Sequence, residues 1–174
     1  MAQGDRTGLR CRPQHQAPAR AERPAGQITR IPNPFLGLIP RELWSRLKDF
    51  FAYTFSFNPL TASAEQTQNI SIQNDSDFLI IFGTCTVTDT LNTTRLTFVP
   101  QLVQLRDSGS GRELFDQSTH FHNVYGTAEE PAYWSFPKLL RAGSTFSVRH
   151  TNQEATDRNV RGAFHGFKVF PMDA

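Results

Sequence analysis

The sequence predicts an all-β protein, a jelly-roll-like β-sandwich of about eight strands. Apolar residues alternate with polar ones over several short stretches, which is the period of a strand with one buried face. Phe accounts for 15 of the 174 residues, against 2 Trp, 3 Tyr and 2 Met, and Phe suits a pleated, half-buried surface. Turn-forming residues separate the stretches at short intervals, as they do in sandwiches and jelly rolls.

The first 39 residues are expected to form an extended arm outside the sandwich. Residues 1–40 hold six Arg against Asp5 and Glu22 and six of the 11 prolines, whereas the remainder holds 12 basic and 14 acidic residues. Such a basic, proline-rich stretch cannot bury enough apolar surface to fold alone. Its arginines lack the interleaved aromatic residues of many nucleic-acid-binding segments. The arginines could neutralise the phosphates of a nucleic acid, but we favour a solvated tail or an arm that orders along a partner protein, and we expect no membrane partner.

Two apolar segments join this arm to the body. Ile31–Pro40 is interrupted by prolines, so it must lie against its own sheet or against a neighbouring subunit. Residues 40–50 predict an amphipathic helix, because Pro40 suits the first position and apolar residues recur at three-to-four spacing. The charges of this helix are balanced, which favours packing on protein over lipid. The expected anchors toward a partner are Arg30, Phe35, Leu36, Leu38, Ile39, Leu43, Trp44 and Leu47.

The predicted jelly-roll body, residues 51–174, is a succession of short stretches with strand character. Most of them alternate apolar and polar residues, and Asn, Asp, Gly and Pro lie between them. Phe78–Phe82 is apolar throughout, which predicts a central strand covered on both faces. Strands are expected at residues 51–57, 70–72, 78–88, 96–105, 114–115, 120–125, 143–150 and 160–169, with an acidic, aromatic loop over residues 127–134.

The last forty or so residues predict a pair of strands joined by one polar loop. In the first strand Phe146, Val148 and His150 share one face. In the second strand, residues 160–169, the alternation changes phase at Gly166. A β-bulge at this glycine would keep the later apolar residues on the same face as the earlier ones.

A metal site of the cupin type is the sharpest enzymatic alternative. His120 and His122 have the i, i+2 spacing that places two ligands on one face of a strand. Glu129 and either His150 or His165 could complete the ligand set. The Glu129 carboxylate lies further along the chain from His122 than in a cupin motif, however, and the glycines of that motif do not align. We therefore expect no metal, no cofactor and no catalytic residue.

The remaining chemical signals are weak. Neither Cys11 nor Cys85 lies in an activating context, and two such free thiols suit a reducing compartment. The sequence contains no run of 18 apolar residues, so no membrane span is predicted. Its first residues do not resemble a secretory signal. Tyr125, Tyr133 and Trp134 predict an aromatic recognition loop, which could stack on sugar rings or seal a subunit interface.

Several motifs of the body resemble those of small virion proteins of tailed bacteriophages, described as capsid cement, decoration or minor capsid proteins. The similarity covers about residues 50–171 and does not extend to residues 1–45. The motifs that carry it are Phe55–Ala64 (FSFNPLTASA), Ile70–Leu79 (ISIQNDSDFL), Asp107–Leu114 (DSGSGREL), Phe136–Thr145 (FPKLLRAGST) and Asn159–Val169 (NVRGAFHGFKV).

This resemblance implies a jelly-roll body that sits on a capsid and has no enzymatic activity. Its implied partners are the major capsid protein and further copies of the chain, as a dimer or trimer, in a virion assembled in the host cytoplasm. A tail or neck component, a host-attachment module that binds sugars and a cupin-like metalloenzyme are the alternatives.

Overall fold

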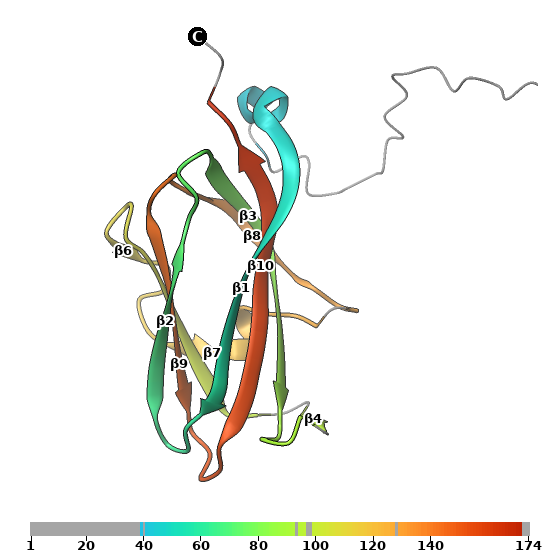
Figure 1. The fold of residues 1–174 in the computed structure, drawn as a ribbon, viewed down its shortest axis with the longest axis vertical. Helices are drawn as coiled ribbons and strands as arrows, with labels where there is room; N and C mark the ends of the chain where they lie inside the picture. Colours follow the sequence, from blue (N-terminus) through green and yellow to red (C-terminus); the bar gives the residue numbers. More distant parts are fainter. Residues whose placement is uncertain (1–38, 40, 93, 97–98, 128, 172–174) are drawn as a thin grey trace, which may run out of the picture. The chain divides into compact units, whose positions relative to one another are not determined.

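The structure, a computed structural model, describes residues 39, 41–92, 94–96, 99–127 and 129–171. The chain divides after Pro32 into two units, and all the described residues belong to the second one. They form a sandwich of two antiparallel β-sheets (Figure 1). This confirms the predicted all-β, jelly-roll-like class.

The described residues contain ten strands, five in each sheet, and two short 3₁₀ helices. Sheet A has the order β1 (Leu47–Leu60), β10 (Arg158–Val169), β3 (Asp77–Thr88) and β4 (Arg95–Leu96), and β8 (Ala132–Leu140) also pairs with β3. Sheet B has the order β2 (Glu65–Ser71), β9 (Thr145–Asn152), β5 (Gln101–Asp107) and β6 (Arg112–Glu113), and β7 (Thr119–His120) also pairs with β5. The 3₁₀ helices are η2 (Arg41–Arg46) and η3 (Phe121–Asn123).

Successive long strands lie in alternate sheets, which is the winding of a jelly roll. The predicted pairing of the last two strands is therefore wrong. Strand β9 pairs with β2 and β5, and β10 pairs with β1 and β3, so the polar loop between them crosses from one sheet to the other. Each of the two strands is central in its own sheet and takes partners on both sides.

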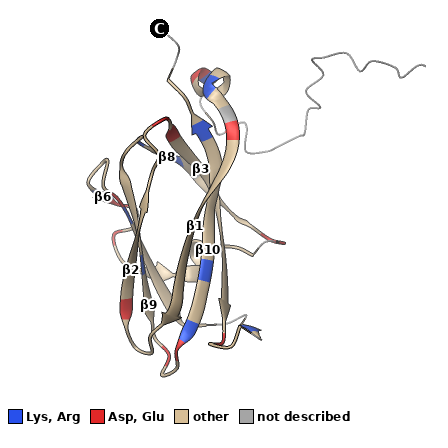
Figure 2. Ribbon diagram, in the orientation of Figure 1, with Lys and Arg blue, Asp and Glu red and all other residues tan. Residues whose placement is uncertain are grey.

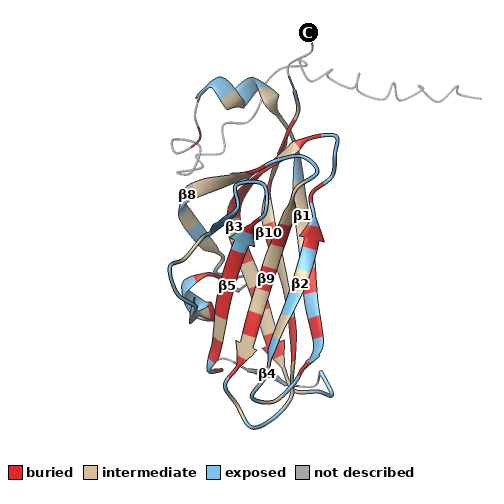
Figure 3. Cartoon of the chain, turned by 90° about the vertical axis from the view of Figure 1, so that its left-hand side faces the viewer, coloured by how far each residue is buried: buried red, intermediate tan, exposed pale blue. Residues whose placement is uncertain are grey.

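The inner core lies between the two sheets and is rich in aromatic rings. Along β9 buried and half-buried residues alternate, as Figure 3 shows, and Phe146, Val148 and His150 are buried as predicted. The Phe146 ring meets the Phe164 ring of the opposite sheet edge-on at 5.0 Å. The Phe55 ring of β1 lies 5.6 Å from the His150 ring of β9. These contacts between the sheets fix their separation.

A β-bulge lies at the place where the sequence predicted one, but its extra residue is on the neighbouring strand. His165 pairs with Phe82, and the next residue, Gly166, pairs with Ile80. Ile81 of β3 is therefore the unpaired residue. Strand β10 keeps its alternation through Gly166.

The apolar residues after the bulge consequently face away from the inner core. Phe164 belongs to the inner core, whereas Phe167 and Val169 belong to a second apolar cluster. The prediction that they share one face is wrong. Gly166 is needed for a different reason, because a Cβ there would lie 1.9 Å from the Leu79 carbonyl oxygen.

The predicted amphipathic helix over residues 40–50 is also wrong. Only Arg41–Arg46 is helical, as a 3₁₀ helix, and β1 begins at Leu47. Leu47 pairs with Val169 and Phe50 pairs with Phe167. These cross-strand pairs bury apolar surface on β10 that a free helix would not reach. Pairing between strands distant in sequence therefore overrides the helical spacing of the apolar residues.

Replacing Gly166 by Ala should destabilise the sandwich by about 3 kcal/mol, because the added methyl collides with backbone that cannot move aside. Urea unfolding followed by fluorescence measures this change. The control is Gly111→Asn at a turn with φ of 67° and open space around it, which should cost less than about 1 kcal/mol. Equal unfolding midpoints for the two variants would contradict the close approach at Gly166.

Candidate functional site

A second apolar cluster covers part of the outer face of sheet A. Its buried members are Ile39, Leu79, Ile81 and Val169, and it is separate from the inner core. Leu79 and Ile81 alternate along β3 with residues that face the inner core, so this strand is buried on both sides as predicted. The partly buried residues that pack against the cluster are Leu43, Leu47, Phe82, Leu139 and Phe167.

Beside this outer cluster lies a row of rings that we call the outer strip: Phe50, Phe82, Tyr133, His165 and Phe167. They come from four strands of sheet A, namely β1, β3, β8 and β10. His165 stacks on Phe82 at 4.5 Å and on Phe50 at 6.1 Å. Phe82 lies 5.0 Å from Tyr133, and Phe50 meets Phe167 edge-on at 5.5 Å. The strip is therefore a continuous aromatic surface across the sheet.

Two rings of the outer strip are widely open to solvent. Phe50 is 57% exposed and Tyr133 is 43% exposed. Trp44, on η2, is 47% exposed. A continuous patch of exposed aromatic residues is more often a protein-binding surface than an ordinary solvated face.

The strip carries no formal charge. Partial burial lowers the pKa of His165, and its Nε2 lies 3.0 Å from the Thr84 hydroxyl. Figure 2 shows that the basic residues of β10 lie toward its two ends, and residues 162–167 between them are uncharged. A partner of this surface would thus be recognised by apolar contact and not by ion pairing.

The 3₁₀ helix η2 is hydrogen-bonded to Ile39, which precedes it, and to Phe170, which follows β10. Trp44 Nε1 donates to the Ile39 carbonyl oxygen at 3.0 Å. Arg46 Nε donates to the Phe170 carbonyl oxygen at 2.7 Å, and the Phe170 amide donates to the Arg46 carbonyl oxygen at 3.2 Å. Ile39 itself is only 4% exposed. The point where the predicted arm joins the body is therefore buried and hydrogen-bonded.

The predicted partner anchors separate into three groups. Ile39 is buried in the outer cluster of its own chain, and the partly buried Leu43 and Leu47 pack against that cluster. Trp44 keeps an exposed ring. The other four predicted anchors, Arg30, Phe35, Leu36 and Leu38, lie outside the described residues.

The predicted aromatic recognition loop does not form one surface. Tyr125 is buried in the inner core, where burial raises the pKa of its hydroxyl well above the ordinary value. Trp134 is half-buried, and its Nε1 donates to the Val124 carbonyl oxygen at 3.2 Å. Tyr133 alone of the three is exposed, and it lies in strand β8 as part of the outer strip.

Of the histidines proposed for a cupin-type metal site, only His120 and His122 lie together. His120 ends β7 and His122 belongs to η3, with their rings stacked at 5.1 Å. His150 is fully buried in the inner core, and His165 lies in the outer strip. Within the described part of the chain, no three His, Cys, Asp or Glu residues are grouped as metal ligands.

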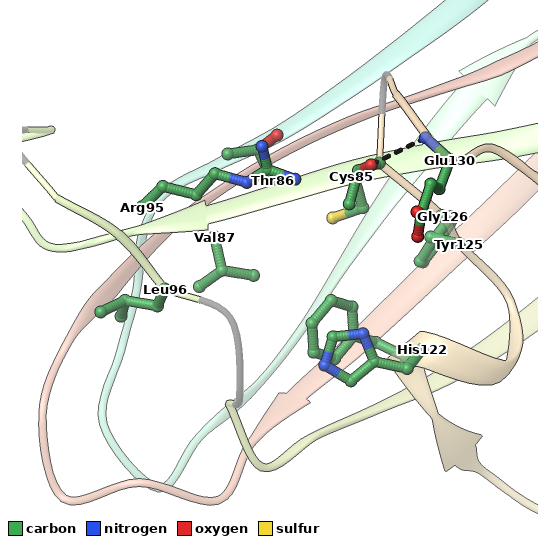
Figure 4. Close-up of a pocket in the computed structure, with 11 residues that line it drawn as sticks. Cys85, Thr86, Val87, Arg95, Leu96, His122, Tyr125, Gly126 and Glu130 are labelled. Carbon is green, nitrogen blue, oxygen red and sulfur yellow. Dashed lines mark hydrogen bonds between the residues drawn. The ribbon is translucent and has the colours of Figure 1, made fainter.

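A pocket of about 380 Å³ opens between β3 and the η3 region (Figure 4). Its lining combines buried apolar groups such as Cys85 and Val87 with polar groups such as His122 and Glu130. Burial raises the pKa of the Cys85 thiol to about 12, so the reactive thiolate is absent at neutral pH. The Arg95 side chain at the pocket is paired with the Glu129 carboxylate at 3.4 Å. Nothing in this lining assembles a nucleophile with a base.

The outer strip is the feature that sequence reasoning missed. A signal for it was present, because the apolar run Phe78–Phe82 and the out-of-phase residues Phe167 and Val169 place apolar side chains on both faces of their strands. What the sequence does not state is that β1, β10, β3 and β8 are neighbours, which brings these residues together.

Comparisons with protein-family models, with curated proteins and with solved structures found no match to this chain. Across the described residues, no helix has the length and apolar character needed to cross a membrane.

The stability of the body should fall as the pH is lowered from 6.5 toward 3, because burial lowers the pKa of His150 from 6.5 to about 3. The unfolded chain takes up a proton at this histidine below pH 6.5, and the folded chain does not. The free energy of unfolding should therefore drop by about 1.4 kcal/mol for each pH unit in this window from His150 alone. Urea unfolding of the wild type and of His150→Gln between pH 6 and pH 4 checks this. Parallel pH profiles would contradict it.

Proposed function

We propose that this protein is a structural virion protein that binds and stabilises a phage capsid, as a cement or decoration protein. The resemblance of its body to small virion proteins of tailed phages supports this role. The structural observation that carries the proposal is the fastened origin of the N-terminal arm. A basic, proline-rich arm begins at a buried residue, Ile39, on the outer face of a sandwich.

Among the described residues, the inner core runs from Phe55 to Phe164. The arm adds contact area on a neighbouring protein in this proposal. A segment that orders on binding can wrap a large surface for its length.

The exposed surface next to the arm suits the same role. Trp44 and the outer strip present uncharged aromatic rings, and Trp44 lies five residues after Ile39. Aromatic residues are enriched where proteins bind one another. We propose the major capsid protein and further copies of this chain as the partners.

Removing residues 1–32 should abolish binding to capsids while leaving the body folded. The deletion stops short of Ile39, because that residue belongs to the outer cluster. The expected result is an unchanged thermal midpoint together with loss of cosedimentation with phage particles that lack the protein. Binding that survives the deletion would refute the role of the arm.

The matched control is the full chain with Leu91→Ser. Leu91 is 78% exposed in the turn after β3. This variant should cosediment like the wild type. Absence of binding by the wild type itself would refute the capsid assignment, and electron microscopy of the particles separates a capsid position from one in the tail or neck.

A further inference from the structure

Strand β1 is an edge strand of sheet A. Among the described residues it pairs with β10 and with no other strand. An edge strand presents a row of backbone N–H and C=O groups to which a further strand can bond. We propose that β1 of a second copy of this chain pairs with this edge, so that the two A sheets join in a symmetric dimer. The inference concerns the chain in solution and does not rest on the capsid role.

One hydrogen bond of Ser56 shows which residues of β1 point outward. The Ser56 amide donates to Gln68 Oε1 of β2 at 2.7 Å, and so points away from β10. The register with β10 is unbroken from Ser56 back to Phe50. In an antiparallel pair every second residue bonds across the ladder, so the amides of Thr54, Ala52 and Phe50 also point away from β10. Within the described part of the chain, no backbone hydrogen bond outside the ladder reaches these three amides.

The available edge is short and has a definite centre. It ends at Ser56, whose amide is already bonded, and it begins at Phe50, because the register with β10 shifts before that residue. Ala52 is the middle one of the three outward residues. Two antiparallel copies of this edge therefore place Ala52 opposite Ala52 of the second copy, and Phe50 opposite Thr54. The two copies would exchange about six backbone hydrogen bonds, two for each pair.

The side chains on this edge suit a second copy. Phe55 belongs to the inner core, so the alternation places Phe50, Ala52 and Thr54 on the outer face of sheet A. The small Ala52 side chain leaves room at the two-fold axis, where the two copies come closest. Phe50, which is 57% exposed, would lie beside the Thr54 methyl of the second copy, and pairs of an aromatic with a β-branched residue stabilise sheets.

Strand β1 also lacks the features that commonly prevent pairing at an edge. Its stretch from Phe50 to Phe57 contains no charged residue and no proline. Strand β8, which pairs only with β3, contains Pro137, and its register with β3 is interrupted. A symmetric β1 pair uses the same edge on both copies and closes as a dimer, whereas pairing between two different edges would continue into a filament.

The size of this contact predicts a weak dimer. A stable complex buries about 800 Å² on each partner, and a pairing of five residues offers less. Light scattering of the full chain should therefore show the mass rise from one chain to two as the concentration increases, with no larger species. A mass that stays at one chain, or that rises beyond two, would overturn the proposal.

Opposite charges at the two-fold axis test the register. Ala52→Lys and Ala52→Glu should each weaken dimerisation by roughly tenfold or more, because like charges then lie directly opposite each other. An equimolar mixture of the two variants should dimerise again, since opposite charges then meet. Thermal midpoints close to the wild-type value show that each variant is folded. A mixture that pairs no better than either variant alone would refute this register.

Disulfide crosslinking gives a second measurement that needs no charge at the axis. In the full chain with Cys11→Ser, Ala52→Cys should crosslink two chains on oxidation, because opposite residues of a hydrogen-bonded pair lie about 5.5 Å apart at Cα, within disulfide range. Ser56→Cys is the matched control, since Ser56 is exposed on the same face but lies off the axis. Equal crosslinking of the two variants would overturn the dimer. Capsid binding enters none of these measurements, so the dimer and the proposed function are tested separately.

Discussion

The arrangement of this protein depends on the burial of one strand on both of its faces. In the run Phe78–Phe82 of β3, residues of the inner core alternate with residues of the outer cluster. An antiparallel sandwich ordinarily covers only one face of each sheet and leaves the other to water. Sheet A therefore needs a cover on its outside, and Ile39 with the 3₁₀ helix η2 supplies part of it. The residues that join arm and body are part of the fold for this reason.

The β-bulge concentrates the apolar surface at one end of sheet A. Because Ile81 is the extra residue, both it and Phe82 belong to the outer cluster or pack against it. Beyond the bulge the alternation of β3 is ordinary, with buried Cys85 and Val87 between half-buried threonines. Gly166 permits the bulge, since its missing side chain lets two backbones approach. One irregular position thus divides the outer face into an aromatic part and a part suited to water.

The sequence was informative where the relevant signal is local. Period-two alternation located most strands, and it placed His150 on the buried face of β9 with its neighbours Phe146 and Val148. Sequence patterns gave the wrong element where a contact between residues distant in sequence determines the structure. The spacing of apolar residues from Leu43 to Phe50 also fits a helix, and the pairing of Phe50 with β10 decides for a strand. The outer strip was out of reach for the same reason, because it depends on the order of strands in sheet A.

The burial of Ile39 ties the residues between arm and body to the outside of sheet A. Its side chain packs in one cluster with Leu79 and Ile81 of β3 and with Val169 of β10. The Trp44 indole donates a hydrogen bond to the Ile39 carbonyl oxygen, and Arg46, at the end of η2, donates one to the Phe170 carbonyl oxygen. Loss of the Ile39 side chain would therefore expose the outer face of β3 and remove the apolar contact that holds this junction to the sheet.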